Sequence, residues 1–203
     1  MQKGGKTVMR VLVACEFSGV VRDAFRARGH DAYSCDLIDS ESNYHITGSV
    51  YGLVDGAWDL MIAHPPCTYL CNSGVRWLHE IPGRWRDMQE GAIFFHDLWK
   101  TRTAHIPKIC VENPIPHKHA LLDPYTQIIH PWQFGHKEMK ATCLWLKGLP
   151  ELEPTDVVGP PPKDKEERKK WQKVHRASPG PDRWKERSIT KTGIAQAMAE
   201  QWG

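Results

Sequence analysis

The sequence predicts an α/β fold with a mainly parallel sheet flanked by helices, and three observations support this prediction. Short apolar runs rich in β-branched residues, typical of strands buried on both faces, recur along the chain. Segments with helical periodicity separate several of these runs, as in βαβ units. Reactive polar residues follow three of the runs, where the ligand-binding edge of a parallel sheet is expected.

The first half of the chain contains three of the expected strands. Residues 9–17, MRVLVACEF, form the first apolar run, and a Ser-Gly pair ends it. Residues 19–30 follow with apolar side chains at helical spacing, which predicts a helix that stops near its last glycine. The second and third strands are expected at residues 31–38 and 58–64.

The second half contains a long helix, two further strands and a terminal helix. Residues 88–102 carry Ala, Phe and Trp side chains at helical spacing, which predicts one apolar helix face. Strands are expected at residues 105–113 and 141–149. Residues 192–202 should form a helix that packs back on the sheet.

The composition changes after Leu149. Residues 150–187 contain seven prolines and little apolar periodicity, so we expect a loop-rich excursion there. One short helix, from Lys165 to Val174, is expected within it.

Positive charge is concentrated in the same part of the chain. Residues 163–191 hold 11 Lys and Arg against 5 Asp and Glu, whereas the rest of the chain holds 16 against 19. A local excess of positive charge favours a polyanionic partner. The alternative is a solvated basic loop that binds nothing.

Composition also narrows the class of protein. The 203 residues are 40% hydrophobic and 25% charged, as expected for one soluble domain. No apolar run approaches the roughly 18 residues of a membrane span, and the N-terminus lacks an apolar signal core, so we expect a cytoplasmic protein without a membrane partner. The six cysteines lie in apolar or strand-like contexts, which predicts free thiols rather than a disulfide framework.

Three segments with reactive side chains lie at expected strand ends: EFSG at 16–19, HPPC at 64–67 and ENP at 112–114. Because ligands of open α/β sheets bind beyond the carboxyl ends of the strands, convergence of these segments indicates one site. Asp36 ends the second expected strand, where its carboxylate could accept hydrogen bonds from ribose hydroxyls. It could also serve only as a cap or a turn residue.

Cys67 and Glu112 are the candidate catalytic residues. A thiolate is a strong nucleophile, and the two prolines before Cys67 would hold it rigidly against a ring. A protonated Glu112 could give a proton to a ring nitrogen during the attack, and Asn113 could hold the backbone at the strand end. The alternative is a buried structural thiol and a surface carboxylate.

In order and type, these motifs resemble those of the cytosine-C5 methyltransferase family. The likeness spans most of residues 10–149 and the last fifteen residues, and its specific parts are the PPC and EN motifs. The matching positions, in chain order, are Phe17, Ser18, Gly19, Asp36, Asp59, Pro65, Pro66, Cys67, Glu112, Asn113, Lys140, Thr142, Thr192 and Gly193.

The resemblance implies a Rossmann-like fold of S-adenosylmethionine-dependent methyltransferases. It implies that the cofactor, S-adenosylmethionine, lies against Phe17, Ser18, Gly19 and Pro65, with Asp36 on its ribose.

The resemblance also implies a reaction on C5 of cytosine in DNA. Cys67 would add to C6 of the base while Glu112 protonates N3, with Asn113 at the strand end. Lys140 and Thr142 would help to hold the target base.

The sequence departs from the family pattern at Val21, Arg22, Ser49, Leu70, Cys71, Pro114 and Thr142. The large target-recognition region that precedes the last motifs of the family is absent, and residues 150–187 take its place as a Pro-rich basic insertion. Residues 1–149 and 188–203 would then form the catalytic domain. This short arrangement also resembles compact DNA methyltransferases of phages and prophages.

Contact with the nucleic acid is expected from the insertion. Arg168, Lys169, Lys170 and Lys173 could lie along a phosphate backbone. Two tryptophans among these charges could stack on exposed bases or anchor the loop to the core.

Several alternatives stay open on the sequence. Amino-methyltransferases place an aromatic residue after two prolines, where this chain has Cys67. The same C5 chemistry could act on RNA or another pyrimidine, and a silent nucleic-acid-binding module would need neither Cys67 nor Glu112. A zinc site from Cys67, Cys71 and His79 lacks a clear fourth ligand, and no metal is expected.

Overall fold

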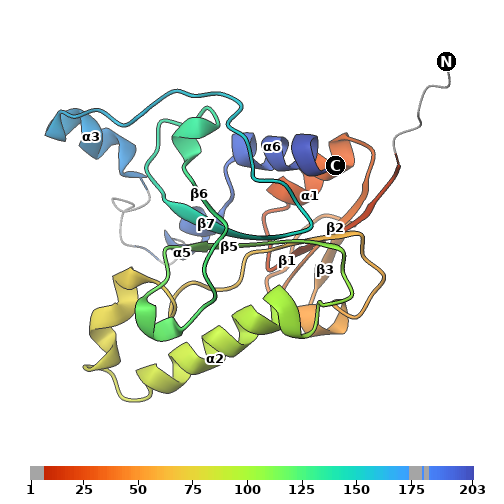
Figure 1. Cartoon of the computed structure of the whole chain (residues 1–203), viewed down its shortest axis with the longest axis horizontal. Coiled ribbons are helices and arrows are strands. Elements are labelled where there is room, and N and C mark those ends of the chain that lie inside the picture. The colour runs from red at the N-terminus through yellow and green to blue at the C-terminus, as the bar shows by residue number, and fades with distance from the viewer. Residues whose placement is uncertain (1–6, 174–179, 181–182) are drawn as a thin grey trace.

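In the computed structural model, residues 7–173, 180 and 183–203 are described, and they form three layers (Figure 1). The described residues contain seven strands in one sheet, in the order β3-β2-β1-β4-β5-β7-β6. The strand bounds are β1 Arg10–Ala14, β2 Asp31–Asp36, β3 His45–Thr47, β4 Leu60–Ala63, β5 Lys108–Pro114, β6 Gln127–Ile129 and β7 Thr142–Lys147. Strands β1 to β5 pair in parallel, and β7 is antiparallel to both of its neighbours. The predicted α/β fold with a mainly parallel sheet is confirmed.

Helices cover both faces of the sheet. Figure 1 shows α1 (Val20–Ala27) and α6 (Thr192–Trp202) on one face and α2 (Arg84–His96) on the other. Alternate residues of each central strand face these two layers. In β1, Val11 and Val13 pack on the α1 and α6 side, whereas Leu12 and Ala14 pack on the α2 side. Burial on both faces explains why the central strands read as continuous apolar runs.

The remaining helices are short. They are α3 (Lys165–Trp171), α5 (Arg183–Ser188), the 3₁₀ helices η1 (Val50–Gly52), η2 (Asn72–Leu78), η4 (Lys118–Ala120) and η5 (Pro131–Gln133), and the π-helical turn η3 (Asp97–Thr101) that continues α2. None of the described helices is long and apolar enough to cross a membrane.

The topology places a switch point between β1 and β4. From β1 the chain moves outward to β2 and β3, and it then returns to β4 on the other side of β1. Connections therefore diverge in opposite directions above the ends of β1 and β4. A crevice for a ligand is expected at such a point.

Several element predictions were wrong in position or omitted. Strands β3 and β6 left no signal in the sequence, since each has three residues and only one of the six, Ile129, is buried. The long helix begins at Arg84 rather than at 88, because Gly83 adopts a left-handed φ of 81° immediately before it. Helix α3 ends at Trp171, and the expected end at Val174 lies outside the described residues.

The first part of the expected insertion packs on the domain. Leu152 is 1% exposed and belongs to the same core as α1 and α6. Asp156 forms a backbone bridge with Phe134, and the Glu153 backbone exchanges hydrogen bonds with the side chain of Gln201. Residues 152–156 are therefore part of the globular body, and the N–H of Val158 still donates to the carbonyl of Trp132 at 2.9 Å, so the excursion begins later.

Glycine at 193 is required by packing. A Cβ at this position would lie 1.9 Å from the backbone oxygen of Phe134, which cannot move without shifting η5. We expect Gly193→Ala to destabilise the fold by about 1–3 kcal/mol, measured by urea unfolding. As a matched control, Gly91→Ala in α2 meets only Leu70 and Tyr69 side chains, no nearer than 3.4 Å, and should stabilise by about 0.5–1 kcal/mol. Equal effects of the two changes would contradict this packing argument.

Candidate active site

The end of β1 carries a strained residue and a buried carboxylate. Cys15 adopts a φ of 59°, which is uncommon for a residue with a side chain, and such outliers cluster at functional sites. Glu16 follows it and is 4% exposed. Its carboxylate accepts hydrogen bonds from the backbone N–H groups of Val21 (2.7 Å) and Arg22 (3.3 Å). Glu16 therefore caps the first turn of α1 from within the core.

The other residues of the first motif lie in the turn between β1 and α1. Phe17 and Ser18 are partly exposed, and Ser18 Oγ lies 3.4 Å from a carboxylate oxygen of Glu16. Gly19 has a left-handed φ of 72°, and a Cβ there would collide with the guanidinium of Arg22. The geometry of the chain alone therefore requires a glycine at this position.

Asp36 ends β2 beside this turn. One carboxylate oxygen accepts a hydrogen bond from the N–H of Ile38 at 3.0 Å, and the side chain is partly exposed. Burial and the nearby Asp36 carboxylate raise the pKa of the Cys15 thiol, so Asp36 stands close to the end of β1. A partly exposed carboxylate at this strand end can bind hydroxyl groups of a ligand.

The end of β4 is fixed to both neighbouring strands. The N–H of His64 donates to the carbonyl of Ala14 at 2.9 Å, which ties the segment to β1. The carbonyl of Pro65 accepts a hydrogen bond from Nδ2 of Asn113 at 2.9 Å, which ties it to β5. Asn113 is 1% exposed. The two hydrogen bonds therefore fix the position of the proline turn relative to β1 and β5.

Cys67 lies in a tight turn that follows these prolines. The N–H groups of Leu70 and Cys71 donate to the Cys67 carbonyl at 3.1 and 3.2 Å. A hydrogen bond with the Cys71 thiol, together with burial, raises the pKa of the Cys67 thiol, although the Lys140 ammonium acts in the opposite direction. The thiol is therefore protonated in the resting protein at neutral pH.

Glu112 sits in a buried cluster of opposite charges. Its Oε2 lies 2.9 Å from Nδ1 of His64, and its Oε1 lies 4.0 Å from Nζ of Lys140. The side chains of Glu112 and His64 are 11% and 12% exposed. Asn113, the residue after Glu112, binds the Pro65 carbonyl two residues before Cys67, so the structure places the segments of Cys67, Glu112 and Lys140 next to one another.

This cluster sets the charges of its members. Burial alone would raise the pKa of Glu112, but Lys140 and the hydrogen bond from His64 outweigh it and hold the pKa at about 2. Burial likewise lowers the pKa of His64, but the carboxylates of Glu112 and Glu16 outweigh it and raise the pKa above 6.5. Between the lowered pKa of Glu112 and the raised pKa of His64, the pair is therefore a carboxylate beside an imidazolium, with the proton on His64 rather than on Glu112.

Two expected base-holding residues have different surroundings. The Lys140 side chain is 17% exposed, and its Nζ donates to the carbonyl of Arg187 at 3.3 Å as well as approaching Glu112. Thr142 is 3% exposed in β7, and its hydroxyl donates to the carbonyl of Lys140 at 3.4 Å. In this conformation the Thr142 hydroxyl is engaged by the chain's own backbone.

The basic segment divides into two parts with different positions. Helix α3 stands out from the body of the molecule in Figure 1, anchored by the buried Trp171, whose carbonyl accepts from the N–H of Met139 at 2.7 Å. Lys169 and Lys170 form ion pairs with Glu166 and Glu167 one turn earlier. Residues 174–179 and 181–182 of the basic segment lie outside the described residues.

Helix α5, by contrast, reaches the candidate site. The Trp184 ring lies 6.2 Å from the Phe17 ring, between centroids, and Trp184 is 53% exposed. The carbonyl of Arg187 accepts a hydrogen bond from Lys140. One end of the insertion therefore contacts both the first motif and the Glu112 cluster.

Sequence reasoning missed several residues that the structure places here. Glu16 and His64 stood within the EFSG and HPPC segments but were given no role of their own, although each is an ionisable residue at the end of an apolar run. An aromatic cluster was also missed. Its Trp85 ring lies 5.6 Å from His79 and 5.3 Å from His119, and it joins the loop after Cys67 to the loop after β5. No periodicity links these residues, because three separate segments contribute them.

A metal centre finds no support in the geometry. Among residues 7–173, 180 and 183–203, no three His, Cys, Asp or Glu side chains are grouped so that they could hold a metal ion. The zinc hypothesis for Cys67, Cys71 and His79 therefore lacks a ligand cluster in the described part of the chain.

The sequence matches no protein-family model and no curated protein. Among solved structures, the chain is similar to the methyltransferase EhMeth of Entamoeba histolytica, with a TM-score of 0.47 and 13% sequence identity. The match covers 75% of this chain and 58% of that one. The chain thus spans less than two thirds of the length of EhMeth, and the functional assignment has to be argued from the site.

The Glu112 cluster should make stability depend on pH in both directions. The lowered pKa of Glu112 contributes stability above its ordinary value of 4.5, and this is lost as the pH falls toward 2. The raised pKa of His64 contributes stability below 6.5, and this is lost as the pH rises through the higher folded value. Glu112→Gln should therefore lower the free energy of unfolding by about 1.5–3 kcal/mol between pH 4.5 and pH 6.5, and by less below and above this range.

Urea unfolding from pH 3 to pH 9 measures this difference. Glu90→Gln is the matched control, because Glu90 is 69% exposed in its pair with Arg86 and its removal should change little. A penalty for Glu112→Gln that does not vary with pH would show that the cluster is not ionised as described.

Proposed function

We propose that this protein is an S-adenosylmethionine-dependent methyltransferase that acts on C5 of cytosine in DNA. The observation that carries the proposal is the hydrogen bond from Asn113 to the Pro65 carbonyl, which holds the Pro-Pro-Cys67 turn beside the Glu112–Asn113 segment, with Lys140 next to the Glu112 carboxylate. A thiol beside a buried acid–base pair fits addition to an electron-poor ring better than it fits a structural role.

The cofactor fits the described edge of the sheet. The switch point lies between β1 and β4, and the partly exposed Asp36 carboxylate stands at the end of β2, where it suits ribose hydroxyls. Phe17 and Ser18 present partly exposed side chains at the end of β1, and Pro65 follows the end of the neighbouring β4. When bound there, S-adenosylmethionine would supply an electrophilic methyl group.

The residues of the chain would activate the base in the following way. The sulfur of Cys67 bonds to C6 of cytosine while N3 gains a proton through Glu112, which makes C5 nucleophilic. Once C5 carries the methyl group, solvent takes the C5 proton, the S–C6 bond breaks and N3 gives its proton back, which releases the thiolate. Since the thiol is protonated at rest, it must pass its proton to solvent when the substrate binds, and it regains one from solvent after the product is released.

A base stacked inside a duplex cannot present C6 to the partly exposed Cys67, so the target has to be flipped out or single-stranded. Two surfaces beside the site could receive the strand. The first is α5 with the exposed Trp184, and the second is the cluster of Trp85 with His79 and His119. Because the insertion is short, few base-edge contacts are available and sequence specificity should be short or relaxed.

Removal of the nucleophile gives the most direct test. We expect Cys67→Ala to abolish turnover with S-adenosylmethionine and defined DNA, measured by nucleoside mass spectrometry. Wild-type protein should form a covalent adduct with DNA that contains 5-fluorocytosine, because fluorine cannot leave C5 as a proton does. Cys110→Ala, which truncates a buried thiol of β5 inside the core, is the control and should keep its adduct.

The same assay distinguishes the competing functions. Modified cytidine in RNA, with none in DNA, would move the proposal to an RNA substrate. Turnover by Cys67→Ala near the wild-type rate would place the chemistry elsewhere. Binding of DNA with no product and no adduct in any substrate would leave a nucleic-acid-binding module.

The proposed binding of phosphates by the basic segment predicts a steep salt dependence. Neutralising Arg168, Lys169, Lys170 and Lys173 should weaken binding to all DNA sequences. It should also lower the slope of log affinity against log salt, by about 0.9 for each phosphate of duplex DNA that the variant no longer neutralises. The ion pairs of Lys169 and Lys170 with Glu166 and Glu167 predict that these two lysines contribute least.

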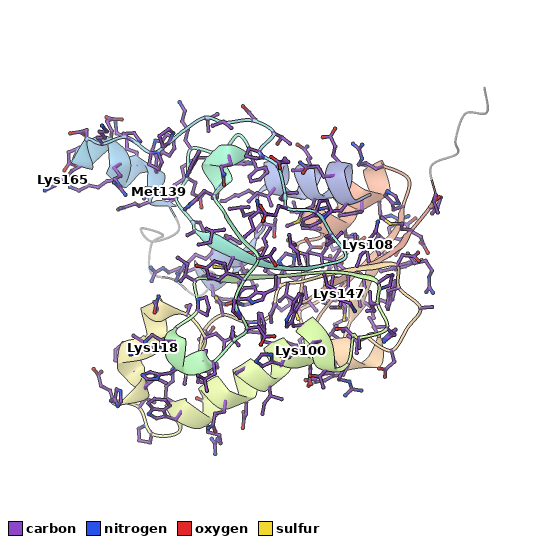
Figure 2. All side chains as sticks on the ribbon, in the orientation of Figure 1. Lys100, Lys108, Lys118, Met139, Lys147 and Lys165 are labelled. Atoms are coloured by element: carbon purple, nitrogen blue, oxygen red, sulfur yellow. The ribbon has the colours of Figure 1, made fainter. Side chains whose placement is uncertain are left out.

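Fluorescence anisotropy at several salt concentrations provides the measurement. Lys100→Gln is the control, since Figure 2 shows Lys100 well away from Lys165 of α3. An unchanged slope in the quadruple variant would mean that α3 is a solvated surface helix.

A further inference from the structure

His64 occupies a position between two carboxylates from different strands. Its Nδ1 lies 2.9 Å from Glu112 at the end of β5, and the carboxylate of Glu16, after the end of β1, also acts on it. Its side chain is 12% exposed. Nε2 is buried and makes no hydrogen bond to any residue in the described part of the chain. The imidazole is therefore held through Nδ1, in direct contact with the proposed acid.

The charges around this pair determine where a proton resides. Three ionisable groups act on the His64 ring or its partner: Glu112, Glu16 and, 4.0 Å from Glu112, Lys140. Lys140 favours the ionised form of Glu112 and disfavours the protonated form of His64, whereas both carboxylates favour the imidazolium. A carboxylate held in this way has no proton of its own to give to a substrate.

We propose that His64 is a positioning residue that stores the proton which Glu112 passes to N3 of the target base. This inference rests on the proposed function. It assigns to this chain a two-residue donor, built from the ends of β4 and β5, in place of a protonated glutamate acting alone.

The proton balance of the step is closed. As the sulfur of Cys67 bonds to C6, N3 takes a proton from Glu112, and Glu112 takes the Nδ1 proton of His64. The imidazole ring of His64 is then neutral and keeps its remaining proton on Nε2. Nε2 needs no hydrogen-bond acceptor for proton storage, because its proton is never transferred. When the S–C6 bond breaks, N3 returns its proton along the same path, so the Glu112–His64 pair neither gains nor loses a proton over the cycle. The one proton that the reaction releases is the C5 proton, which passes to solvent.

The first test separates proton storage from simple orientation of Glu112. His64→Asn keeps an N–H group near the position of Nδ1 but cannot ionise. We expect its kcat at pH 7 to fall by about 100-fold, in the range of general acid catalysis, while its KM for S-adenosylmethionine is unchanged. His105→Asn is the matched control, because His105 is exposed and its Nε2 contacts the Gly56 carbonyl, at 3.3 Å, away from the site.

The pH–rate profile gives a readout that an orienting role would not move. Both proteins must deprotonate Cys67, so the ratio of wild-type kcat to His64→Asn kcat removes that shared pH dependence. The ratio should rise about tenfold per pH unit up to the pKa of His64 and stay level above it, because Glu112 of the variant must take its proton from solvent. A variant that keeps kcat within about threefold of the wild type, with the same profile, would overturn the proposal.

The second test needs no turnover. Imidazole NMR of the resting protein should show His64 titrating above pH 6.5, and Glu112→Gln should lower its pKa. A neutral His64 throughout this range in the wild type would exclude proton storage even if the enzyme is active. Conversely, His64 could titrate as expected in a protein that neither modifies cytosine nor forms an adduct with it. That result would support the His64–Glu112 ion pair and reject cytosine as the substrate.

Discussion

The register of three parallel strands is the constraint on which the site depends. Ala14 of β1 pairs with Ala63 of β4, and Ala63 pairs with Val111 of β5. The next residues along the chain, Cys15, His64 and Glu112, therefore lie side by side, with Glu112 still paired to Leu144 of β7. A slip of one residue between β4 and β5 would move Glu112 to the other face and separate it from His64. The apolar strands thus determine which polar side chains meet.

The charges brought together by this register show how environment sets ionisation. Glu16 and Glu112 are both buried, yet burial raises the pKa of Glu16 whereas Lys140 and His64 lower that of Glu112. The difference lies in their partners. Glu16 is satisfied mainly by backbone N–H groups at the start of α1, and Glu112 by two cationic side chains. Buried carboxylates with divergent pKa values are a recurrent feature of acid–base sites.

Much of the fold followed from the sequence because burial on both faces leaves a strong local signal. Strands β1, β2, β4, β5 and β7 and helix α6 were each predicted from an apolar run or from helical periodicity. Strands β3 and β6 were not, since they are short edge strands whose pairing depends on neighbours distant in the chain. Helix α5 was missed for a similar reason, because its six residues include none that is buried.

The candidate site was predictable only in part. Cys67, Glu112 and Asn113 stood in recognisable motifs, and the structure places them at one edge. The pairing of His64 with Glu112 was not predictable, because residues 48 positions apart meet only through strand register. The resting ionisation of Glu112 was likewise not predictable, since it depends on Lys140 from the segment before β7.

The position of α5 gives the insertion a role that its charge alone did not suggest. Two of its contacts, Trp184 to Phe17 and Arg187 to Lys140, fall on the first motif and on the residue that keeps Glu112 ionised. Movement of α5 away from the domain would remove the carbonyl partner of Lys140. Since Lys140 acts to lower the pKa of both Glu112 and Cys67, a shift of its ammonium group would change the pKa of both side chains. On the proposed function, substrate binding and activation of the site would then be coupled through one lysine.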